Sequence, residues 1–233
     1  MVDLSAEMAE LWASIGAPAL ARAPVIQFIA ARGGEGTSTI ARELAFYAAR
    51  TLARRVWLID LDLMAQGQMA TIERCSARYG ELGAAVSASP DGSMFFTVQP
   101  PLKRPDGRPW PDARYLTAHA VGGPGFWVTQ FRAEALRGRQ TPHILPTGDY
   151  WNTLRRHADL VIVDAPAVER SQAGLTVARF MDQIVLVVAA DQGDVHAPAQ
   201  LREAIEDAGG RCAGLFFNRA NLDAPGFLRG ILP

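Results

Sequence analysis

The chain has 233 residues, of which 49% are hydrophobic and 20% charged, and its formal net charge is −1. These values indicate a soluble globular protein with a substantial core, and they argue against nucleic acid as a partner. No apolar run approaches the roughly 20 residues of a membrane-spanning helix, and the two cysteines are too far apart to indicate a zinc site. We therefore expect a cytoplasmic protein without a transmembrane segment.

Residues 1–23 form an N-terminal segment with an apolar stripe at helical spacing. The stripe consists of Met8, Leu11, Trp12 and Ile15. It predicts a helix that packs on the surface of the protein's own domain, and a helix that docks on a partner would show the same pattern.

Five apolar runs predict buried strands of a parallel sheet, because they are continuous rather than alternating. They cover residues 25–30, 55–60, 160–166, 183–190 and 212–218. Helical patterns separate them, including one that follows the first strand and one that precedes the last. This alternation predicts an α/β fold with a three-layer, doubly wound, mainly parallel sheet. We expect one domain over residues 24–222, followed by a tail over residues 223–233.

Residues 87–146 interrupt the alternation of strands and helices, and we interpret them as an insertion. The segment is rich in proline and glycine, and the glycines between Gly122 and Gly125 indicate a hairpin. A flexible lid, a surface for a partner and an excursion without a function are all compatible with this composition.

The sequence RGGEGTST, residues 32–39, joins the first predicted strand to its helix. Gly33, Gly34 and Gly36 allow the backbone to turn its N–H groups toward an anion, and the helix N-terminus adds partial positive charge. Ser38 and Thr39 follow, where a hydroxyl can cap the helix or bind Mg²⁺. The arrangement is typical of a phosphate-binding loop.

Three aspartates end neighbouring strands of the predicted sheet. Asp60 and Asp62 close the second strand, and Asp164 closes the third. Carboxylates at this edge of an open α/β sheet lie where ligands bind, and Mg²⁺ prefers oxygen ligands. Together with the glycine-rich loop, they predict a site for a nucleotide with Mg²⁺.

These motifs resemble those of the MinD/ParA-like P-loop ATPases, and most closely the bacterial tyrosine kinases (BY-kinases) that work with exopolysaccharide and capsule co-polymerases. Residues 34–39 match the Walker A loop, Asp60 and Asp62 the Walker A′ motif, and Asp164 and Pro166 the Walker B motif. The resemblance covers roughly residues 24–222. It implies a P-loop NTPase-like fold that uses ATP or ADP with Mg²⁺.

The resemblance also assigns roles to individual residues. Catalytic roles fall on Asp60, Asp62 and Asp164, and metal binding falls on Ser38, Asp62 and Asp164. Nucleotide binding falls on Arg32, Gly33, Gly34, Glu35, Gly36, Thr37, Ser38 and Thr39, and on Asn218 near the adenine base.

Two departures from the family's loop bear on phosphoryl transfer. Thr37 stands where the P-loop lysine supplies positive charge to the phosphates. Arg32 stands where deviant Walker motifs carry an additional lysine, and arginine suits phosphate. Either Arg32 rescues nucleotide binding or it is an ordinary solvated arginine.

Further departures affect regulation. The last tyrosine is Tyr150, so the C-terminal tyrosine cluster of autophosphorylating members is absent, and the N-terminal oligomerisation motif is poorly kept. We therefore expect a degenerate family member that binds nucleotide weakly or not at all and acts as a regulator or adaptor in exopolysaccharide or capsule biosynthesis or export. Its expected partner is an inner-membrane polysaccharide co-polymerase or another export component, which would hold it at the membrane periphery, and a homodimer is also compatible.

Two alternatives to this function remain open. One is an active ATPase, and the other is a MinD/ParA-like positioning protein, with Arg32 in place of the missing lysine in either case. Residues 225–233 contain apolar side chains beside Arg229, which indicates either packing at a sheet edge or a short membrane-targeting tail.

Overall fold

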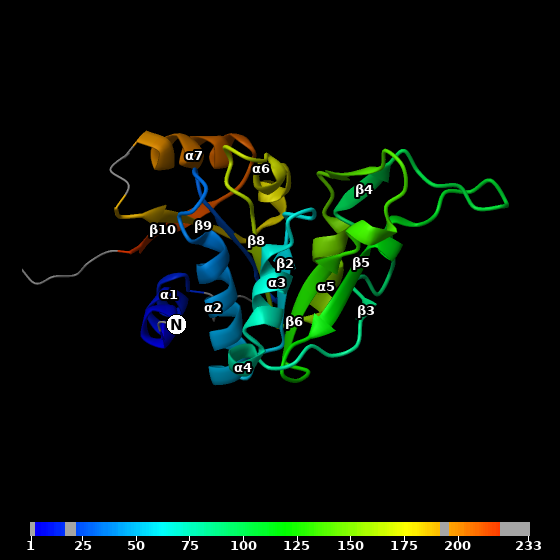
Figure 1. Cartoon of the computed structure of the whole chain (residues 1–233). Coiled ribbons are helices and arrows are strands. Elements are labelled where there is room, and N and C mark those ends of the chain that lie inside the picture. Colours follow the sequence, from blue (N-terminus) through cyan, green and yellow to red (C-terminus); the bar gives the residue numbers. More distant parts are fainter. Residues whose placement is uncertain (1–2, 17–21, 192–195, 220–233) are drawn as a thin grey trace, which may run out of the picture.

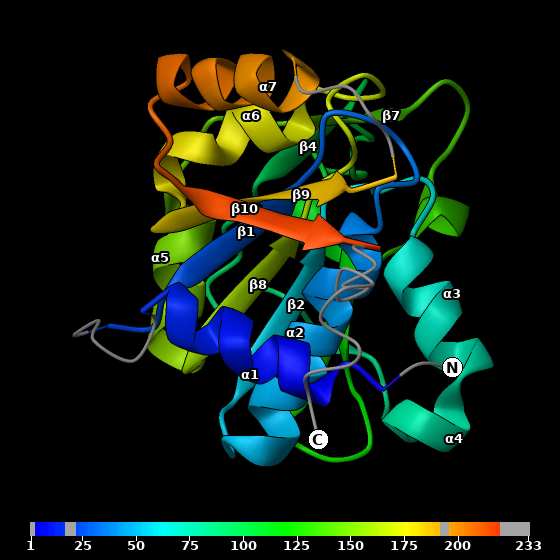
Figure 2. The same ribbon diagram turned by 90° about the vertical axis from the view of Figure 1, so that its left-hand side faces the viewer.

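The computed structural model describes residues 3–16, 22–191 and 196–219. Its centre is an eight-stranded sheet in the order β10-β9-β1-β8-β2-β6-β5-β3 (Figures 1 and 2). Neighbouring strands from β10 to β6 pair in parallel, and β5 and β3 continue the sheet antiparallel. The strands are β1 (Val25–Ile29), β2 (Val56–Asp60), β3 (Val86–Ser87), β5 (Leu116–Ala120), β6 (Phe126–Phe131), β8 (Leu160–Asp164), β9 (Gln183–Ala189) and β10 (Cys212–Asn218).

The five strands expected from continuous apolar runs are all present, and they form one parallel sheet. Every residue of β1, β2 and β8 is buried, as expected for strands covered on both faces. The mainly parallel α/β fold class predicted from the sequence is therefore confirmed. The strand ends that carry Asp60 and Asp164 lie side by side, because these two residues are register partners across β2 and β8.

Helices cover both faces of the sheet and complete the three layers (Figure 2). One hydrophobic core joins the sheet to α1 (Ser5–Ser14), α2 (Thr37–Thr51), α3 (Gly67–Arg74) and α4 (Ser76–Tyr79). The other joins it to α5 (Asp149–His157), α6 (Ala173–Val177) and α7 (His196–Asp207). Among the described residues, no helix combines the length and the apolarity that crossing a bilayer requires.

The N-terminal helix packs on the domain itself. The four residues of its apolar stripe, Met8, Leu11, Trp12 and Ile15, are all buried in the core that α2 also lines. This placement confirms a surface-packed helix. The C-terminal tail, residues 223–233, and the membrane-targeting interpretation attached to it lie outside the described residues.

Residues 87–146 contribute to the main sheet. The hairpin expected around Gly122–Gly125 is confirmed, because β5 and β6 pair antiparallel on either side of it. Strand β6 then pairs in parallel with β2, and the indole rings of Trp57 and Trp127 stack with centroids 5.7 Å apart. The sequence predicts the hairpin but not its pairing with β2, because that contact joins segments far apart in the chain. The segment is therefore built into the main sheet as well as protruding from it.

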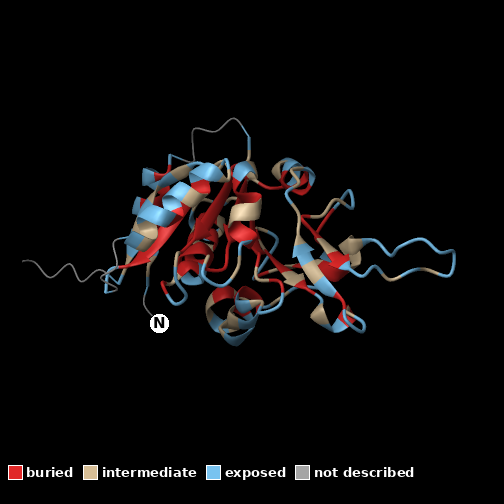
Figure 3. Cartoon of the chain, turned by 90° about the horizontal axis from the view of Figure 1, so that it is seen from above, coloured by how far each residue is buried: buried red, intermediate tan, exposed pale blue. Residues whose placement is uncertain are grey.

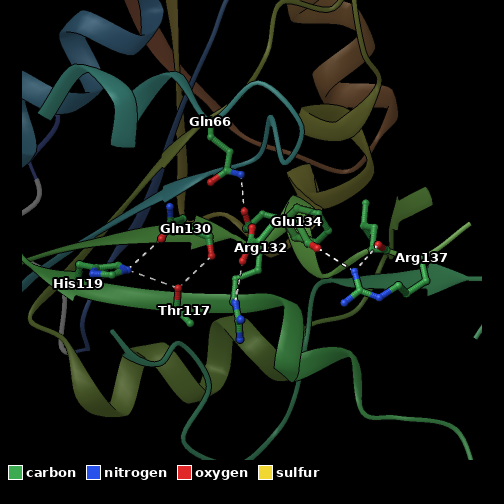
Figure 4. Close-up of polar contacts among 9 residues, drawn as sticks. Gln66, Thr117, His119, Gln130, Arg132, Glu134 and Arg137 are labelled. Atoms are coloured by element: carbon green, nitrogen blue, oxygen red, sulfur yellow. Dashed lines mark hydrogen bonds and ion pairs between the residues drawn. The ribbon is translucent and has the colours of Figure 1, made fainter. Parts of the chain in front are cut away.

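The rest of this segment lies beyond the sheet. Strands β4 (Phe96–Gln99) and β7 (Thr141–Ile144) form a separate antiparallel pair. Residues 102–110 form a largely exposed arm that projects from the body (Figure 3). Figure 4 shows how the segment is tied to the loop after β2, where the side-chain amide of Gln66 donates a hydrogen bond to the carbonyl of Phe131.

Candidate nucleotide-binding site

The loop between β1 and α2 turns sharply at two glycines. Gly34 and Gly36 have φ angles of 81° and 95°, which strongly favour glycine. The Gly36 carbonyl accepts hydrogen bonds from the N–H groups of Thr39 and Ile40, 2.9 and 3.1 Å away, and so starts the helix. A Cβ atom at Gly36 would lie 2.0 Å from Nδ2 of Asn218. Both the turn and the close approach therefore require glycine at this position.

Glu35 and Asn218 fix the loop through hydrogen bonds to its backbone and to β9. The Glu35 carboxylate is buried and accepts hydrogen bonds from the N–H groups of Arg32 (3.0 Å) and Ala189 (3.3 Å). The Asn218 side-chain amide donates to the Glu35 carbonyl at 2.8 Å. These contacts fix the shape of the loop, so both side chains have a structural role in addition to the binding role that the resemblance assigns them.

A cleft of about 360 Å³ lies over the loop and the first turn of α2. It brings together seven of the predicted binding residues with the segment that follows β8. Its lining consists of Arg32, Gly33, Gly34, Gly36, Thr37, Ser38 and Thr39, with Ala165, Pro166, Ala167, Arg170 and Arg219. We call this the phosphate cleft. Thr37, the first residue of α2, is only 9% exposed.

A second cavity of about 140 Å³ adjoins the phosphate cleft and contains the three predicted aspartates. We call this the carboxylate cavity. Its lining consists of Ser38, Asp60, Asp62, Ala65, Gly67, Asp164, Pro166 and Arg170. The structure therefore brings Ser38, Asp62 and Asp164, the predicted metal ligands, to one place.

Asp60 and Asp164 are both nearly inaccessible to solvent, with exposures of 6% and 4%. Burial raises the pKa of Asp60 to about 7, and repulsion from Asp164 adds to this effect. Burial likewise raises the pKa of Asp164 to about 6. Two adjacent buried carboxyl groups retain a proton readily, and a cation bound between them would displace it.

A fully buried glutamine, Gln68 on α3, connects these carboxylates to the loop. Its side-chain amide donates to Oδ2 of Asp164 (2.7 Å) and to the Ser38 carbonyl (2.8 Å), while its backbone N–H donates to Asp60. Its Oε1 accepts a hydrogen bond from buried Arg42 at 3.0 Å. Neither Gln68 nor Arg42 belongs to a motif, so neither can be predicted from the sequence.

Three charged residues beyond the motifs also contact the site. The Glu169 carboxylate accepts a hydrogen bond from the Gly33 N–H at 2.5 Å, and Arg170 forms an ion pair with Asp62. Arg219 donates to the Gly34 carbonyl at 2.7 Å. The N–H groups of Arg32 and Gly33 are therefore both already bound to anionic side chains.

The donor set suits a hard cation that brings other ligands with it. Within residues 3–16, 22–191 and 196–219, no three His, Cys, Asp or Glu side chains are arranged as a complete metal site. Mg²⁺ in nucleotide sites usually needs only one or two carboxylates, because phosphate and water supply the rest. Oδ1 of Asp164 is buried without a hydrogen-bond partner in the described part of the chain, which fits such a cation.

Comparison with solved structures places this fold beside two groups of P-loop proteins. The chimeric protein CapA2B2 has a TM-score of 0.60 at 16% identity, over 94% of this chain and 86% of that one. The kinase domain of Escherichia coli tyrosine kinase ETK has a TM-score of 0.58 at 16% identity, over 95% and 79%. MinD from Pyrococcus horikoshii, complexed with Mg-ADP, has a TM-score of 0.56 at 13% identity, over 88% and 75%.

These structural similarities include both groups that the sequence motifs indicated, the bacterial tyrosine kinases and the MinD/ParA-like ATPases. At 13–16% identity they establish the fold that the chain shares with them. No protein-family model matches the chain, and no curated protein sequence does.

Proposed function

We propose that this protein binds a magnesium nucleotide, ATP or ADP, at residues 32–39 and acts as a regulator or adaptor in exopolysaccharide or capsule biosynthesis or export. One observation carries the proposal. The glycine-rich turn and the three aspartates converge on adjoining cavities, and Thr37, which the resemblance aligns with the P-loop lysine, carries no charge. Binding and catalysis would therefore be separated in this chain.

Binding depends on groups that the chain retains. The positive φ angles of Gly34 and Gly36 shape the turn at the N-terminus of α2, where backbone N–H groups attract phosphate. Ser38, Asp62 and Asp164 would hold Mg²⁺, and Asp60 would support them from its buried position. The ion would neutralise phosphate charge, and the carboxylates would orient it.

Catalysis depends on the group that the chain lacks. A preorganised donor aimed at charge that develops in a transition state is commonly worth roughly 3–4 kcal/mol. Thr37 carries no charge and its side chain is too short to follow a transferred phosphoryl group. We expect turnover to fall by roughly a hundredfold to a thousandfold relative to a lysine-containing site.

The proposed partner is an inner-membrane polysaccharide co-polymerase or another export component, which would bring a cytoplasmic protein to the membrane surface. The sequence resemblance and the fold shared with a tyrosine kinase domain support this partner. Co-purification of the tagged chain from cells that make the polysaccharide tests it. Failure to recover an export component, together with unchanged polysaccharide after deletion of the gene, would remove the pathway from the proposal.

Calorimetry with Mg-ATP and Mg-ADP, on the wild type and on Thr37→Lys, tests the nucleotide site. We expect binding without turnover by the wild type, and measurable hydrolysis after the lysine is restored. Thr39→Lys serves as a control, because it adds the same charge at an exposed position of the same cleft. If neither the wild type nor Thr37→Lys binds nucleotide, the nucleotide site is ruled out and the protein is a scaffold that does not bind nucleotide.

A working ATPase is the second candidate, because Arg32 lines the phosphate cleft and carries a permanent charge. Turnover by the wild type that is lost in Arg32→Ala would establish this function and overturn the adaptor. A MinD/ParA-like positioning role for a homodimer would require nucleotide-dependent dimerisation. Sedimentation velocity with each nucleotide measures that directly.

A further inference from the structure

We infer that Arg170 supplies the positive charge toward phosphate that the loop lacks at Thr37. This inference rests on the proposed nucleotide binding and assigns a further residue to that site. Arg170 lies outside the glycine-rich loop, on the turn that follows β8. Its position between the two cavities is the main reason for the assignment.

In the part of the chain that the structure describes, three residues line both the phosphate cleft and the carboxylate cavity, and they are Ser38, Pro166 and Arg170. Of the three, Arg170 alone is charged. A nucleotide whose phosphates follow the loop and whose Mg²⁺ lies at the aspartates must pass this boundary. The guanidinium is therefore close to the point where the terminal phosphate and the metal meet.

The other two arginines of the phosphate cleft are less well placed for this role. Arg219 uses its guanidinium for the Gly34 carbonyl (2.7 Å) and for Asp191 (3.3 Å), so it holds the back of the loop. Arg32 lines the phosphate cleft but not the carboxylate cavity. Arg170 is thus the arginine that adjoins both the phosphate-binding turn and the predicted metal ligands.

The backbone at Arg170 is fixed while its side chain is accessible. Its N–H donates to the Ala167 carbonyl at 2.9 Å, and the next N–H donates to the same carbonyl at 3.1 Å. The side chain is 61% exposed and pairs with Asp62. An exposed pair of this kind contributes little stability, so exchanging its partner costs little.

Magnesium binding would release Arg170 from this pair. Once Asp62 coordinates Mg²⁺, its charge is taken up by the metal, and the guanidinium is left beside the phosphate groups. Arginine binds phosphate through two parallel N–H donors, which is among the strongest charge-assisted contacts. Metal binding and phosphate binding by Arg170 would therefore reinforce each other.

The test is calorimetry of Mg-ATP, Mg-ADP and adenosine with the wild type, Arg170→Ala and Arg170→Lys. We expect Arg170→Ala to weaken Mg-ATP binding about tenfold or more, Mg-ADP binding less, and adenosine binding not at all. Arg170→Lys should retain part of the affinity. The matched control is Arg202→Ala, which removes an arginine of 63% exposure from a surface ion pair on α7.

A second arm measures the relation to Thr37. In a Thr37→Lys background the lost charge is restored, so Arg170→Ala should cost several times less affinity than it does in the wild type. Circular dichroism confirms that each variant is folded. Mg-ATP affinity in Arg170→Ala that equals or exceeds that of the wild type would overturn the inference while nucleotide binding stands. Absence of Mg-ATP binding by the wild type would overturn both.

Discussion

Replacing Asp60 by asparagine should change the stability of this protein in a strongly pH-dependent way. Asp60 is buried beside Asp164, and its pKa of about 7 lies well above the ordinary value of 3.8. Between about pH 4 and pH 7 the folded protein holds a proton on Asp60 that the unfolded chain releases. The free energy of unfolding of the wild type therefore falls as the pH rises through this window.

The size of the effect follows from this difference in pKa. Each pKa unit corresponds to about 1.4 kcal/mol, so the Asp60 carboxyl alone contributes a loss of roughly 3 kcal/mol between pH 5 and pH 8. Asparagine avoids this loss because it does not ionise. Both carboxylate oxygens of Asp60 accept backbone hydrogen bonds, from Asp62 at 2.9 Å and from Gln68 at 3.2 Å. Asparagine has only one acceptor oxygen, so one of these two hydrogen bonds is lost. A lost bond costs about 1 kcal/mol.

Asp60→Asn should therefore be about 1 kcal/mol less stable than the wild type near pH 5 and exceed it by roughly 2 kcal/mol at pH 8. Urea unfolding at both pH values, without nucleotide or Mg²⁺, measures the difference. Asp159→Asn is the control, because its hydrogen bonds with Arg55 lower the pKa of Asp159. That group is ionised throughout the window, and its contribution is lost only as the pH falls through its lowered pKa.

The reasoning fails if Asp60→Asn changes the unfolding free energy by the same amount at pH 5 and pH 8. It also fails if the variant is less stable than the wild type at pH 8. Either result would mean that the two carboxyl groups are not strained by burial and mutual repulsion in the folded state.

Two further predictions concern the scaffold. Gly36→Ala should lower the melting temperature and abolish nucleotide binding, since the new Cβ would overlap Asn218; Gly92→Ala, with a similar φ of 80° and open space, should cost less in the same thermal assay. Asp182→Asn should lower the free energy of urea unfolding by roughly 3–5 kcal/mol, because Arg155, only 8% exposed, would lose its carboxylate partner. A loss below about 1 kcal/mol would show that this pair behaves like a surface ion pair.

The core of the site could be predicted because its signals are local. A buried parallel strand has a continuous apolar run, and a carboxylate that follows the run must lie at the sheet edge. The same reasoning places Asp60, Asp62 and Asp164 at that edge from the sequence alone. The glycine-rich loop is equally local, because its backbone angles determine which residues it tolerates.

The surrounding residues could not be predicted because only the folded chain brings them together. Gln68 belongs to an unremarkable helix, and its role depends on α3 lying beside the Ser38 carbonyl and Asp164. Glu169 and Arg170 follow β8 without any pattern that separates them from solvated charges. The glycines at residues 122–125 predict the β5–β6 hairpin, but no local signal indicates that β6 pairs with β2.

The stacked indoles of Trp57 and Trp127 give this protein an intrinsic optical reporter. Two aromatic rings 5.7 Å apart and 15° from parallel couple their electronic transitions. One ring belongs to the strand that carries Asp60, and the other to the hairpin within residues 87–146. The near-ultraviolet circular dichroism of the unlabelled protein should therefore reveal whether that hairpin remains paired with β2 when a ligand or a partner binds.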